Sequence, residues 1–383
     1  MPSRLLRFLA AVSFSAGAVP GQAVKVRPAS TLAYPAPIVD GNSPSVWVDG
    51  KLQVYTSTGD PLEMAGADLF SLRQSASPVV VPRDHYPIWI EAVWRSADGT
   101  IYGWYHHEPG GVCPGGKLTA PQIGALVSDD GGSTFRDLGI VLSTGDPLNC
   151  GARNGFFAGG HGDFSVILDQ DQRYFYFLFG NYGGPMEHQG VAIARMRFEY
   201  RDDPVGAVHK YYGGGWDEPG IGGLVAPIFQ AAVSWEGSNP DALWGPSIHW
   251  NTHLNAYVAV LNRSCCESGW PQEGIYLSIG GDLSDPGSWS RPIKIMDADT
   301  IGFAPGYYPQ VVGIDAGGTD TVAGGTARLF IKGISKWELV FLTADESTVT
   351  TEPTVPPEAQ PALPIDGAVA AQTRTLWLRP PNQ

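Results

Sequence analysis

The chain is poor in charged residues, and the basic ones are the scarcer kind. Only 16% of its 383 residues are charged, and 24 Lys and Arg stand against 38 Asp and Glu, which gives a formal net charge of −14. A surface of this sign repels phosphate backbones, so we expect no nucleic-acid partner. Because 43% of the residues are hydrophobic, the chain can nevertheless bury a large core, and an intrinsically disordered protein is excluded.

Long apolar runs are also missing. The candidate nearest to one covers residues 9–19, which follow Arg4 and Arg7 and precede the small residues of 20–23. Two serines interrupt it, and it is shorter than the roughly 20 residues that a membrane-spanning helix needs. The pattern predicts a signal peptide over residues 1–23, hence a secreted or periplasmic protein without membrane association. A disordered leader is the alternative interpretation.

Glycine, proline and aromatic residues are abundant instead. The 49 Gly and 32 Pro indicate many turns and disfavour long helices. The 12 Trp, 15 Tyr and 15 Phe, beside so few charges, are typical of a protein that stacks flat rings on a polar but neutral partner such as a sugar.

One module recurs along the chain: a short apolar strand, a tight polar turn and an aromatic-rich strand. The spacing between modules averages roughly 67 residues, which fits a four-stranded propeller blade with its loops. We therefore predict an all-β protein with the architecture of a five-bladed β-propeller. A β-sandwich is the structural rival, but it would not explain five repetitions. The five strand pairs are expected at 45–57, 89–106, 163–179, 245–261 and 308–331.

The predicted propeller domain covers residues 24–345. Residues 346–383 are rich in Pro, Thr and Ala, which is a linker composition, and close with an apolar piece at 373–378. A terminal strand there would close the propeller by covering an open sheet edge. A loose tail is the alternative.

The segment Ser128-Asp-Asp-Gly-Gly-Ser-Thr-Phe135 resembles the Asp box of sialidase-type propellers, a turn between outer strands. The resemblance implies that Asp130 accepts hydrogen bonds from turn amides, that Gly132 has a positive φ and that Phe135 packs between sheets. This role is structural and supports the fold rather than a catalytic function.

The opening module Asn42-Ser-Pro-Ser-Val-Trp-Val-Asp-Gly-Lys51 resembles the first blade of glycoside hydrolases of families 43 and 32, and Leu283-Ser-Asp-Pro-Gly-Ser-Trp289 is similar to their blade-four connection. The resemblance implies a funnel-shaped sugar site on the central axis, with acids on the innermost strands. Two departures stand out. Ser43 replaces the catalytic Asp of the family-43 opening, and Trp244 replaces the Glu of a Glu-Gly-Pro opening, so any working carboxylates come from elsewhere.

Three carboxylates are candidates for glycoside hydrolysis, which needs a proton donor and a second carboxylate. Asp163 enters an otherwise apolar strand, where burial would be costly without a task. Glu91 lies in an apolar strand that would raise its pKa and suit a general acid. Asp40 precedes the first blade and could act as base or nucleophile. Each has a structural alternative. Asp163 could accept hydrogen bonds from loop amides, and Glu91 could pair with a buried Arg or line the central channel. Asp40 could belong to a turn-forming Asp-Gly pair.

The substrate-binding candidates follow from propeller geometry, because first strands start, and second strands end, at the ligand-bearing end. For the His-His-Glu strand end we favour hydroxyl recognition over metal ligation, since a third ligand would have to come from another blade, as His161 could. We expect no metal or other cofactor; a structural Ca²⁺ in the central channel has no ligand pattern to support it. The candidates are His106, His107, Glu108, His161, Asn181, Tyr182, Trp244, Asn262, Arg263 and Tyr308.

The four cysteines fall at this same predicted end. Cys113 follows a second strand and Cys150 precedes the next first strand, so a bridge between them is plausible in an exported protein. Adjacent Cys265 and Cys266 could form a vicinal disulfide beside the ligand. Free thiols or other pairings are the alternative, and no Cys-x-x-Cys metal pattern occurs.

Together these observations predict a secreted, monomeric glycoside hydrolase that cleaves a poly- or oligosaccharide by carboxylate acid and base chemistry in the central funnel. A polysaccharide lyase using His and Tyr on a uronate is a second interpretation. A non-catalytic carbohydrate-binding propeller is a third, and it is consistent with the two missing carboxylates.

Overall fold

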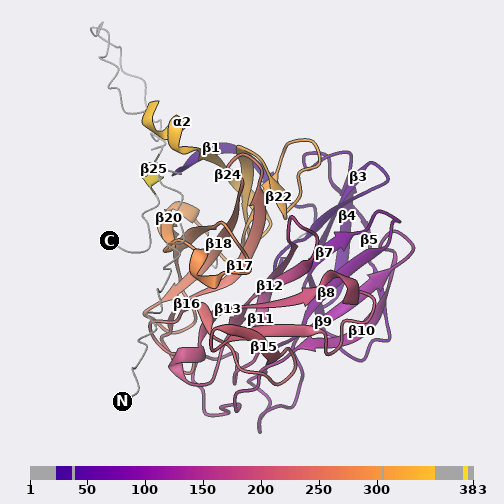
Figure 1. The fold of residues 1–383 in the computed structure, drawn as a ribbon, viewed down its shortest axis with the longest axis vertical. Helices are drawn as coiled ribbons and strands as arrows, with labels where there is room; N and C mark the ends of the chain where they lie inside the picture. The colour runs from indigo at the N-terminus through magenta and orange to yellow at the C-terminus, as the bar shows by residue number, and fades with distance from the viewer. Residues whose placement is uncertain (1–22, 37–38, 304–305, 350–373, 378–383) are drawn as a thin grey trace, which may run out of the picture.

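The computed structural model describes residues 23–36, 39–303, 306–349 and 374–377 (Figure 1). Within these ranges the strands form five sheets, and the inner strands of successive sheets contact one another along the chain. Hydrogen bonds from Ser43 to Gln310 and from Ser45 to Asp320 join the last sheet to the first. The predicted five-bladed β-propeller is therefore confirmed. The predicted signal peptide and most of the Pro/Thr-rich segment lie outside the described residues.

The first three blades follow the chain from the axis outward. Blade one consists of β2 (Ser45–Val48), β3 (Lys51–Ser57), β4 (Pro61–Gly66) and β5 (Arg73–Ala76). Blade two consists of β7 (Ile88–Arg95), β8 (Ile101–His107), β9 (Gln122–Ser128), β10 (Thr134–Leu142) and the parallel edge strand β6 (Val79–Val81). Blade three consists of β11 (His161–Leu168), β12 (Tyr174–Asn181), β13 (Gly190–Arg197), β14 (Val208–Tyr212) and β15 (Gly215–Pro219), with β16 (Pro227–Gln230) beside β13.

The last two blades complete the ring. Blade four consists of β17 (Asp241–Asn251), β18 (Ala256–Cys265), β19 (Gln272–Gly280) and β20 (Ile293–Asp297), with β22 (Val322–Ala323) beside β17. Blade five consists of β21 (Pro309–Gly313), β23 (Thr326–Ile331), β24 (Ile334–Leu342) and β1 (Ala23–Ala33), with β25 (Arg374–Trp377) beside β1. Two short helices are α1 (Ala298–Ile301) and α2 (Ala344–Val349). No helix in the described part of the chain has the length and apolar character to cross a membrane.

Strand β12 shows why the inner strands read as continuous apolar runs. Its residues Phe175, Phe177 and Phe179 pack against blade two, in a cluster that includes Trp104. The alternate residues Tyr176 and Leu178 pack against blade four. Because side chains alternate between the faces of a strand and both faces of the blade are covered, neither set is polar.

The first described strand closes the propeller. β1 pairs antiparallel with β24, in a register that joins Ala23 to Leu342, so blade five contains both early and late parts of the chain (Figure 1). β25, which falls within the predicted strand at 373–378, pairs with the outer edge of β1. Closure through β1 was not expected from the sequence, and it covers the edge of β24.

The turn at 128–135 has the hydrogen bonds that the sequence suggested. Asp130 Oδ1 accepts from the amide of Thr134 at 2.8 Å and from the hydroxyl of Ser128 at 2.9 Å. Gly132 has a φ of 92°, and Phe135 is fully buried. The turn joins β9 to β10 and stabilises the outer part of blade two.

Candidate functional site

A cavity of about 250 Å³ opens at the end of the propeller where first strands begin and second strands end. We call this the near end. All five blades contribute to it, as the face assignment from the sequence requires. Its lining residues are Asp40, Trp89, His106, Glu108, Phe156, Phe157, Asp163, Trp244, Trp270, Tyr307 and Tyr308.

One imidazole connects the acids below this cavity. His106 Nε2 lies 3.4 Å from Glu108 Oε1, and His106 Nδ1 lies 3.5 Å from Glu91 Oε1. His106 Nδ1 is also 3.2 Å from the amide nitrogen of Asp163. It accepts a hydrogen bond from this amide when the ring carries its proton on Nε2. Burial by itself would lower the pKa of His106, but Glu108, Glu91 and Asp163 together hold this pKa well above its ordinary value.

Asp163 lies on the cavity floor because the inner strand β11 bulges at this residue. The pairing of β11 with β12 shifts register between Gly162 and Phe164, and Asp163 has a φ of 42°. The preceding glycine is required, since a Cβ at Gly162 would lie 2.6 Å from His106 Cε1. Burial raises the pKa of Asp163, while the charge on His106 and a hydrogen bond from the Tyr182 hydroxyl to Oδ2 oppose that rise.

Glu91 occupies a second bulge, between Ile90 and Ala92 on β7. Its Oε2 accepts the Phe164 amide at 2.8 Å, and only 2% of the residue is exposed. Burial raises the pKa of Glu91 to about 7, against the opposing effect of His106. Glu91 does not line the cavity: it lies behind His106 and joins β7 to β11 near the axis.

Aromatic rings form the walls of the cavity. Trp244 meets Trp270, Tyr307 and Tyr308 edge to face, with ring centroids 5.1–5.7 Å apart. The Trp244 indole is fixed by a 2.9 Å hydrogen bond from Nε1 to Ser264 Oγ. At the rim Phe156 is 46% exposed. Such rings offer flat apolar faces and edges on which a sugar ring can stack.

A disulfide fastens two of the wall-forming loops together. Cys113 and Cys150 are bonded, with Cα atoms 5.5 Å apart, which confirms the expected pairing. Beside them the backbones of Thr119 and Phe156 share a 3.0 Å hydrogen bond. The loop after β8 and the loop before β11 thereby hold Phe156 and Phe157 over Asp163.

Of the predicted site residues, the structure brings together Asp40, His106, Glu108, Asp163, Trp244 and Tyr308 as cavity lining, with Glu91 and Tyr182 directly behind. Asp40 is exposed at the mouth, whereas Tyr182 is fully buried. The predicted acids and rings thus share one site.

Three other predicted residues lie outside the cavity because they face different neighbours. His107 points to the opposite side of β8, where its ring is 5.3 Å from that of His85. His161 Nε2 accepts from Lys210 Nζ at 3.0 Å inside blade three. Asn181 Nδ2 donates to His188 O at 2.7 Å. Each holds a loop or strand rather than facing the cavity.

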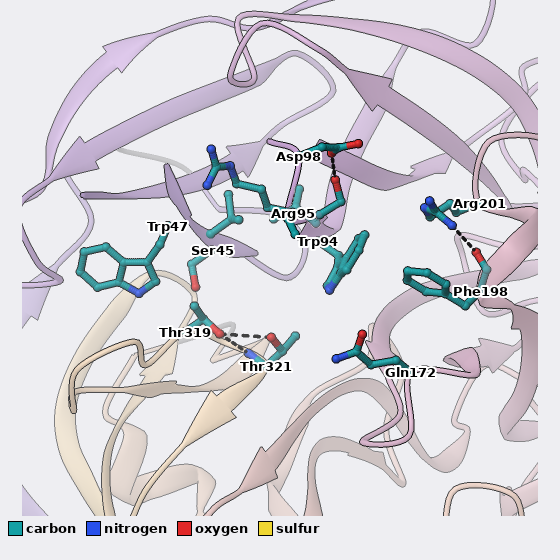
Figure 2. Close-up of a pocket in the computed structure, with 14 residues that line it drawn as sticks. Ser45, Trp47, Trp94, Arg95, Asp98, Gln172, Phe198, Arg201, Thr319 and Thr321 are labelled. Carbon is teal, nitrogen blue, oxygen red and sulfur yellow. Dashed lines mark hydrogen bonds between the residues drawn. The ribbon is translucent and has the colours of Figure 1, made fainter. Parts of the chain in front are cut away.

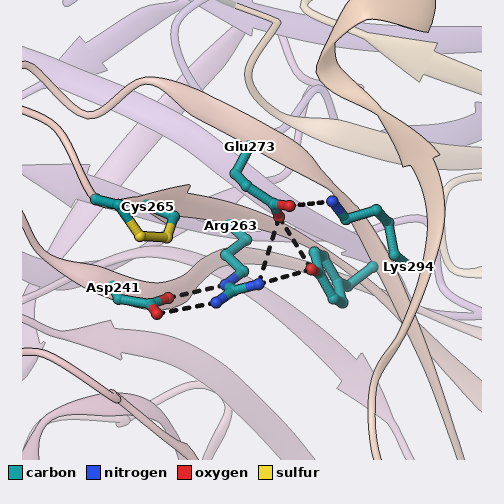
Figure 3. Close-up of a disulfide and its surroundings, with 7 residues drawn as sticks. Asp241, Arg263, Cys265, Glu273 and Lys294 are labelled. Atoms are coloured by element: carbon teal, nitrogen blue, oxygen red, sulfur yellow. Dashed lines mark hydrogen bonds and ion pairs between the residues drawn. A yellow bond between two sulfur atoms is a disulfide. The ribbon is translucent and has the colours of Figure 1, made fainter.

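The two predicted residues on β18 also have protein partners. Asn262 Oδ1 accepts from Gln272 Nε2 at 2.7 Å. Arg263 makes a two-pronged ion pair with Asp241, at 2.8 and 2.9 Å, and donates to Tyr276 (Figure 3). The adjacent Cys265 and Cys266 are bonded to each other next to this pair, outside the cavity lining.

Five lining residues were not among the predicted site residues. Tyr307 and Trp89 stand close to the starts of first strands, where the face argument applies to them as well. The other three belong to loops, for which the sequence carried no signal of direction. These are Phe156, Phe157 and Trp270.

Glu91, His106 and Asp163 are also the buried residues that could hold a metal ion at this site. Their ligand atoms lie within 4.8 Å of one another. One oxygen of each carboxylate is already engaged, by the Phe164 amide and the Tyr182 hydroxyl. A metal would have to use the remaining oxygens.

No protein-family model matches the chain, and no curated protein matches it. Solved structures with a similar fold include the following three. An endo-arabinase from Bacteroides thetaiotaomicron is 11% identical, with 82% of this chain and 96% of that chain covered and a TM-score of 0.47. A thermostable family-43 glycoside hydrolase is 12% identical, with 86% and 100% covered and a TM-score of 0.48. An exo-1,5-α-L-arabinanase from a bovine ruminal metagenomic library is 13% identical, with 81% and 95% covered and a TM-score of 0.46.

Proposed function

We propose that the near-end cavity is the active site of a glycoside hydrolase that acts on a poly- or oligosaccharide. The observation that carries the proposal is the position of Asp163: a buried carboxyl at the floor of a small cavity with aromatic walls. Aromatic rings bind the faces of a sugar, and burial raises the pKa of Asp163, the direction that suits a proton donor. A volume of about 250 Å³ suits one sugar ring at a time.

In this proposal Asp163 is the general acid and Asp40 is the second carboxylate. Tyr182 donates to Oδ2 of Asp163, which leaves Oδ1 to carry the proton toward the glycosidic oxygen. Asp40 is exposed at the cavity mouth, where it can activate water or attack the anomeric carbon. Both residues are catalytic candidates because both line the cavity.

Glu91 and His106 act as positioning residues. His106 links Glu108 on one side to Glu91 on the other, and Glu91 binds the backbone immediately after Asp163. Burial raises the pKa of Asp163 and raises that of Glu91 to about 7, which favours proton retention in this cluster. The cluster also orients Asp163 toward the cavity.

We further propose that the protein is exported. The amino-terminal pattern of a signal peptide supports this, and so does the disulfide between Cys113 and Cys150, since such bonds persist in oxidising compartments.

The direct test is a screen of purified protein against plant and microbial polysaccharides, followed by Asp163→Asn on any substrate that yields new reducing ends. We expect Asp163→Asn to lower kcat roughly 10²–10⁴-fold, because general acid catalysis contributes about that much. Asp171→Asn is the matched control, since Asp171 lies in an exposed turn of the same blade and pairs only with Arg173 among the described residues. Unchanged turnover by Asp163→Asn would contradict the proposal.

A non-catalytic carbohydrate-binding protein is the second candidate, and two positions favour it. Ser43 is buried, with its amide donating to Gln310, and Trp244 fills the cavity wall. The carboxylates that the family resemblance expects at these two positions are therefore absent from the site. Saccharide binding without products would support this candidate, whereas unsaturated products absorbing near 235 nm would indicate a lyase.

A further inference from the structure

A second cavity opens at the opposite end of the propeller, which we call the far end. Its volume is about 720 Å³, and Figure 2 shows side chains of blades one, two, three and five around it. The far end is where first strands end, so β7 contributes Trp89 to the near-end cavity and Trp94 and Arg95 to this one. None of its lining residues belongs to the near-end cavity.

Two arginines line this cavity. The Arg95 side chain is 32% exposed, and the Arg201 guanidinium stacks on the Phe198 ring at 4.3 Å and hydrogen-bonds Tyr102, so the remaining N–H groups of Arg95 are the freer ones. Arg95 Nη2 is 3.5 Å from Asp49, whose carboxylate side chain is 88% exposed, and Arg201 Nη1 donates to Phe198 O at 3.1 Å. Guanidinium groups left in this state are suited to a carboxylate or similar anion.

Aromatic rings and hydroxyls accompany the arginines. Trp47 is fixed by a 3.0 Å hydrogen bond from its Nε1 to Gly318 O, and Trp94 packs edge to face with Phe198 at 5.5 Å. Thr319 and Thr321 offer hydroxyls on the blade-five side. Figure 2 shows these side chains placed around one pocket.

One acid also lines the far end. Asp98 Oδ1 accepts the Ser96 hydroxyl and, at 3.1 Å, the Thr100 amide, which holds this carboxylate in its own turn. The charge of Arg201 also acts on Asp98, so a bound anion would share this arginine with it. Flat apolar rings, hydroxyls and two available cations fit a ligand that has sugar faces and negative charge.

We propose that the far-end cavity binds an acidic saccharide, a chain whose uronate carboxylates pair with Arg95 and Arg201 while a sugar ring stacks on Trp47 or Trp94. The site is separate from the near-end chemistry, and the proposal stands whether or not the near end is catalytic. A protein with both sites would hold an acidic chain at one end of its axis and process or bind a sugar at the other.

The test is calorimetric titration with trigalacturonate and with its fully methyl-esterified form, which removes only the charge. The wild type should bind the charged form at least tenfold more tightly than the ester. Arg95→Gln combined with Arg201→Gln should abolish that preference, and Trp47→Ala should weaken binding of both forms. Arg83→Gln, at an exposed ion pair with Asp60 outside the lining of both cavities, is the matched control and should change nothing.

Three results would overturn the proposal. The first is no binding of trigalacturonate by the wild type. The second is full binding by the folded arginine double variant together with loss in Trp89→Ala, which would place the ligand at the near end. The third is competition by inorganic phosphate at concentrations equal to the trisaccharide, which would indicate a plain anion site. Thermal melting of every variant shows whether the fold is retained.

Discussion

The two ends of this propeller are built on the same inner strands and yet have opposite characters. The near end is small, holds three carboxylates around one imidazole and is walled by rings that pack on one another. The far end is larger and carries two arginines whose Nε atoms have no partner in the described structure. The loops and bulges at each strand end, rather than the strands themselves, therefore determine what each end can bind.

Local backbone geometry explains part of this contrast. At the near end, bulges place Glu91 and Asp163 close together, and two loops are joined by a disulfide. At the far end the corresponding strands run on into ordinary tight turns. A pre-organised site at one end and a more open one at the other are consistent with chemistry in the first and binding in the second.

The largest expected effect comes from opening the near-end loops. Cys113→Ser with Cys150→Ser should lower the free energy of unfolding by roughly 2–4 kcal/mol, because the bond closes a long loop. It should also weaken saccharide binding at the near end and leave far-end binding unchanged. Chemical denaturation and calorimetry measure the two effects.

The control for this change is Cys265→Ser with Cys266→Ser, which removes a disulfide that closes no loop between separate segments. An equal loss of stability in both double variants would show that the Cys113–Cys150 bond does not act through loop closure.

The next effect is a pH dependence confined to the near end. Burial raises the pKa of Glu91 from 4.5 to about 7, so the folded state binds more protons than the unfolded state between these values. Stability therefore falls as pH rises through this window. Glu91→Gln removes the contribution, so its free energy of unfolding relative to wild type should increase by roughly 1–3 kcal/mol from pH 5 to pH 8.

The comparison with wild type matters because other groups titrate in the opposite sense. Burial lowers the pKa values of His161 and His249, so their contribution to stability increases with pH. Both residues remain in Glu91→Gln, and their effect cancels in the difference. A difference that does not vary with pH would contradict the buried, proton-retaining state of Glu91.

A smaller effect separates the stacking surfaces. Trp89→Ala should weaken near-end saccharide binding roughly 2–10-fold, the size expected for one ring contact, without changing far-end binding. Trp47→Ala should weaken saccharide binding at the far end by a similar factor without changing binding at the near end. Trp216→Ala, on the outer strand β15, is the control that should affect neither, and identical losses in both binding assays would mean that the two sites are one.

The smallest expected effect is that of salt. Raising the ionic strength from about 0.05 to 0.5 M should weaken far-end binding of trigalacturonate a few-fold, since exposed charge pairs are screened over a shorter distance. Near-end binding of a neutral saccharide should be constant. A far-end affinity for trigalacturonate that does not change with ionic strength would contradict pairing with Arg95 and Arg201.

The sequence predicted the parts of the fold whose pattern is local. The inner strand pairs, such as β11 and β12, were found because both of their faces are buried and their sequences are continuously apolar. β1 was missed because much of its length is exposed and polar, so nothing in it marks a strand. Its place is set by a partner at the other end of the chain.

The site was predictable to the extent that strand ends determine it. Asp163, His106 and Trp244 follow from the face argument, whereas His107 and Asn181 lie outside the cavity lining because the side of a strand that a residue faces depends on register. Bulges shift that register at Glu91 and Asp163, and a bulge leaves no clear trace in a single sequence. Trp270 comes from a loop whose path only tertiary packing determines.

The pairing of β1 with β24 has a consequence for how the molecule folds. The ion pair between Arg27 and Glu338 joins positions 311 residues apart, so this contact closes nearly the whole described propeller into a ring. Contacts of such separation form late, because the entropy of closing a long loop must be overcome first. Until β24 has formed, β1 cannot pair with it, and blades one to four form an incomplete ring. Completion of the ring is therefore the natural last step of folding, and a weakened β1 would accumulate an open, edge-exposed intermediate.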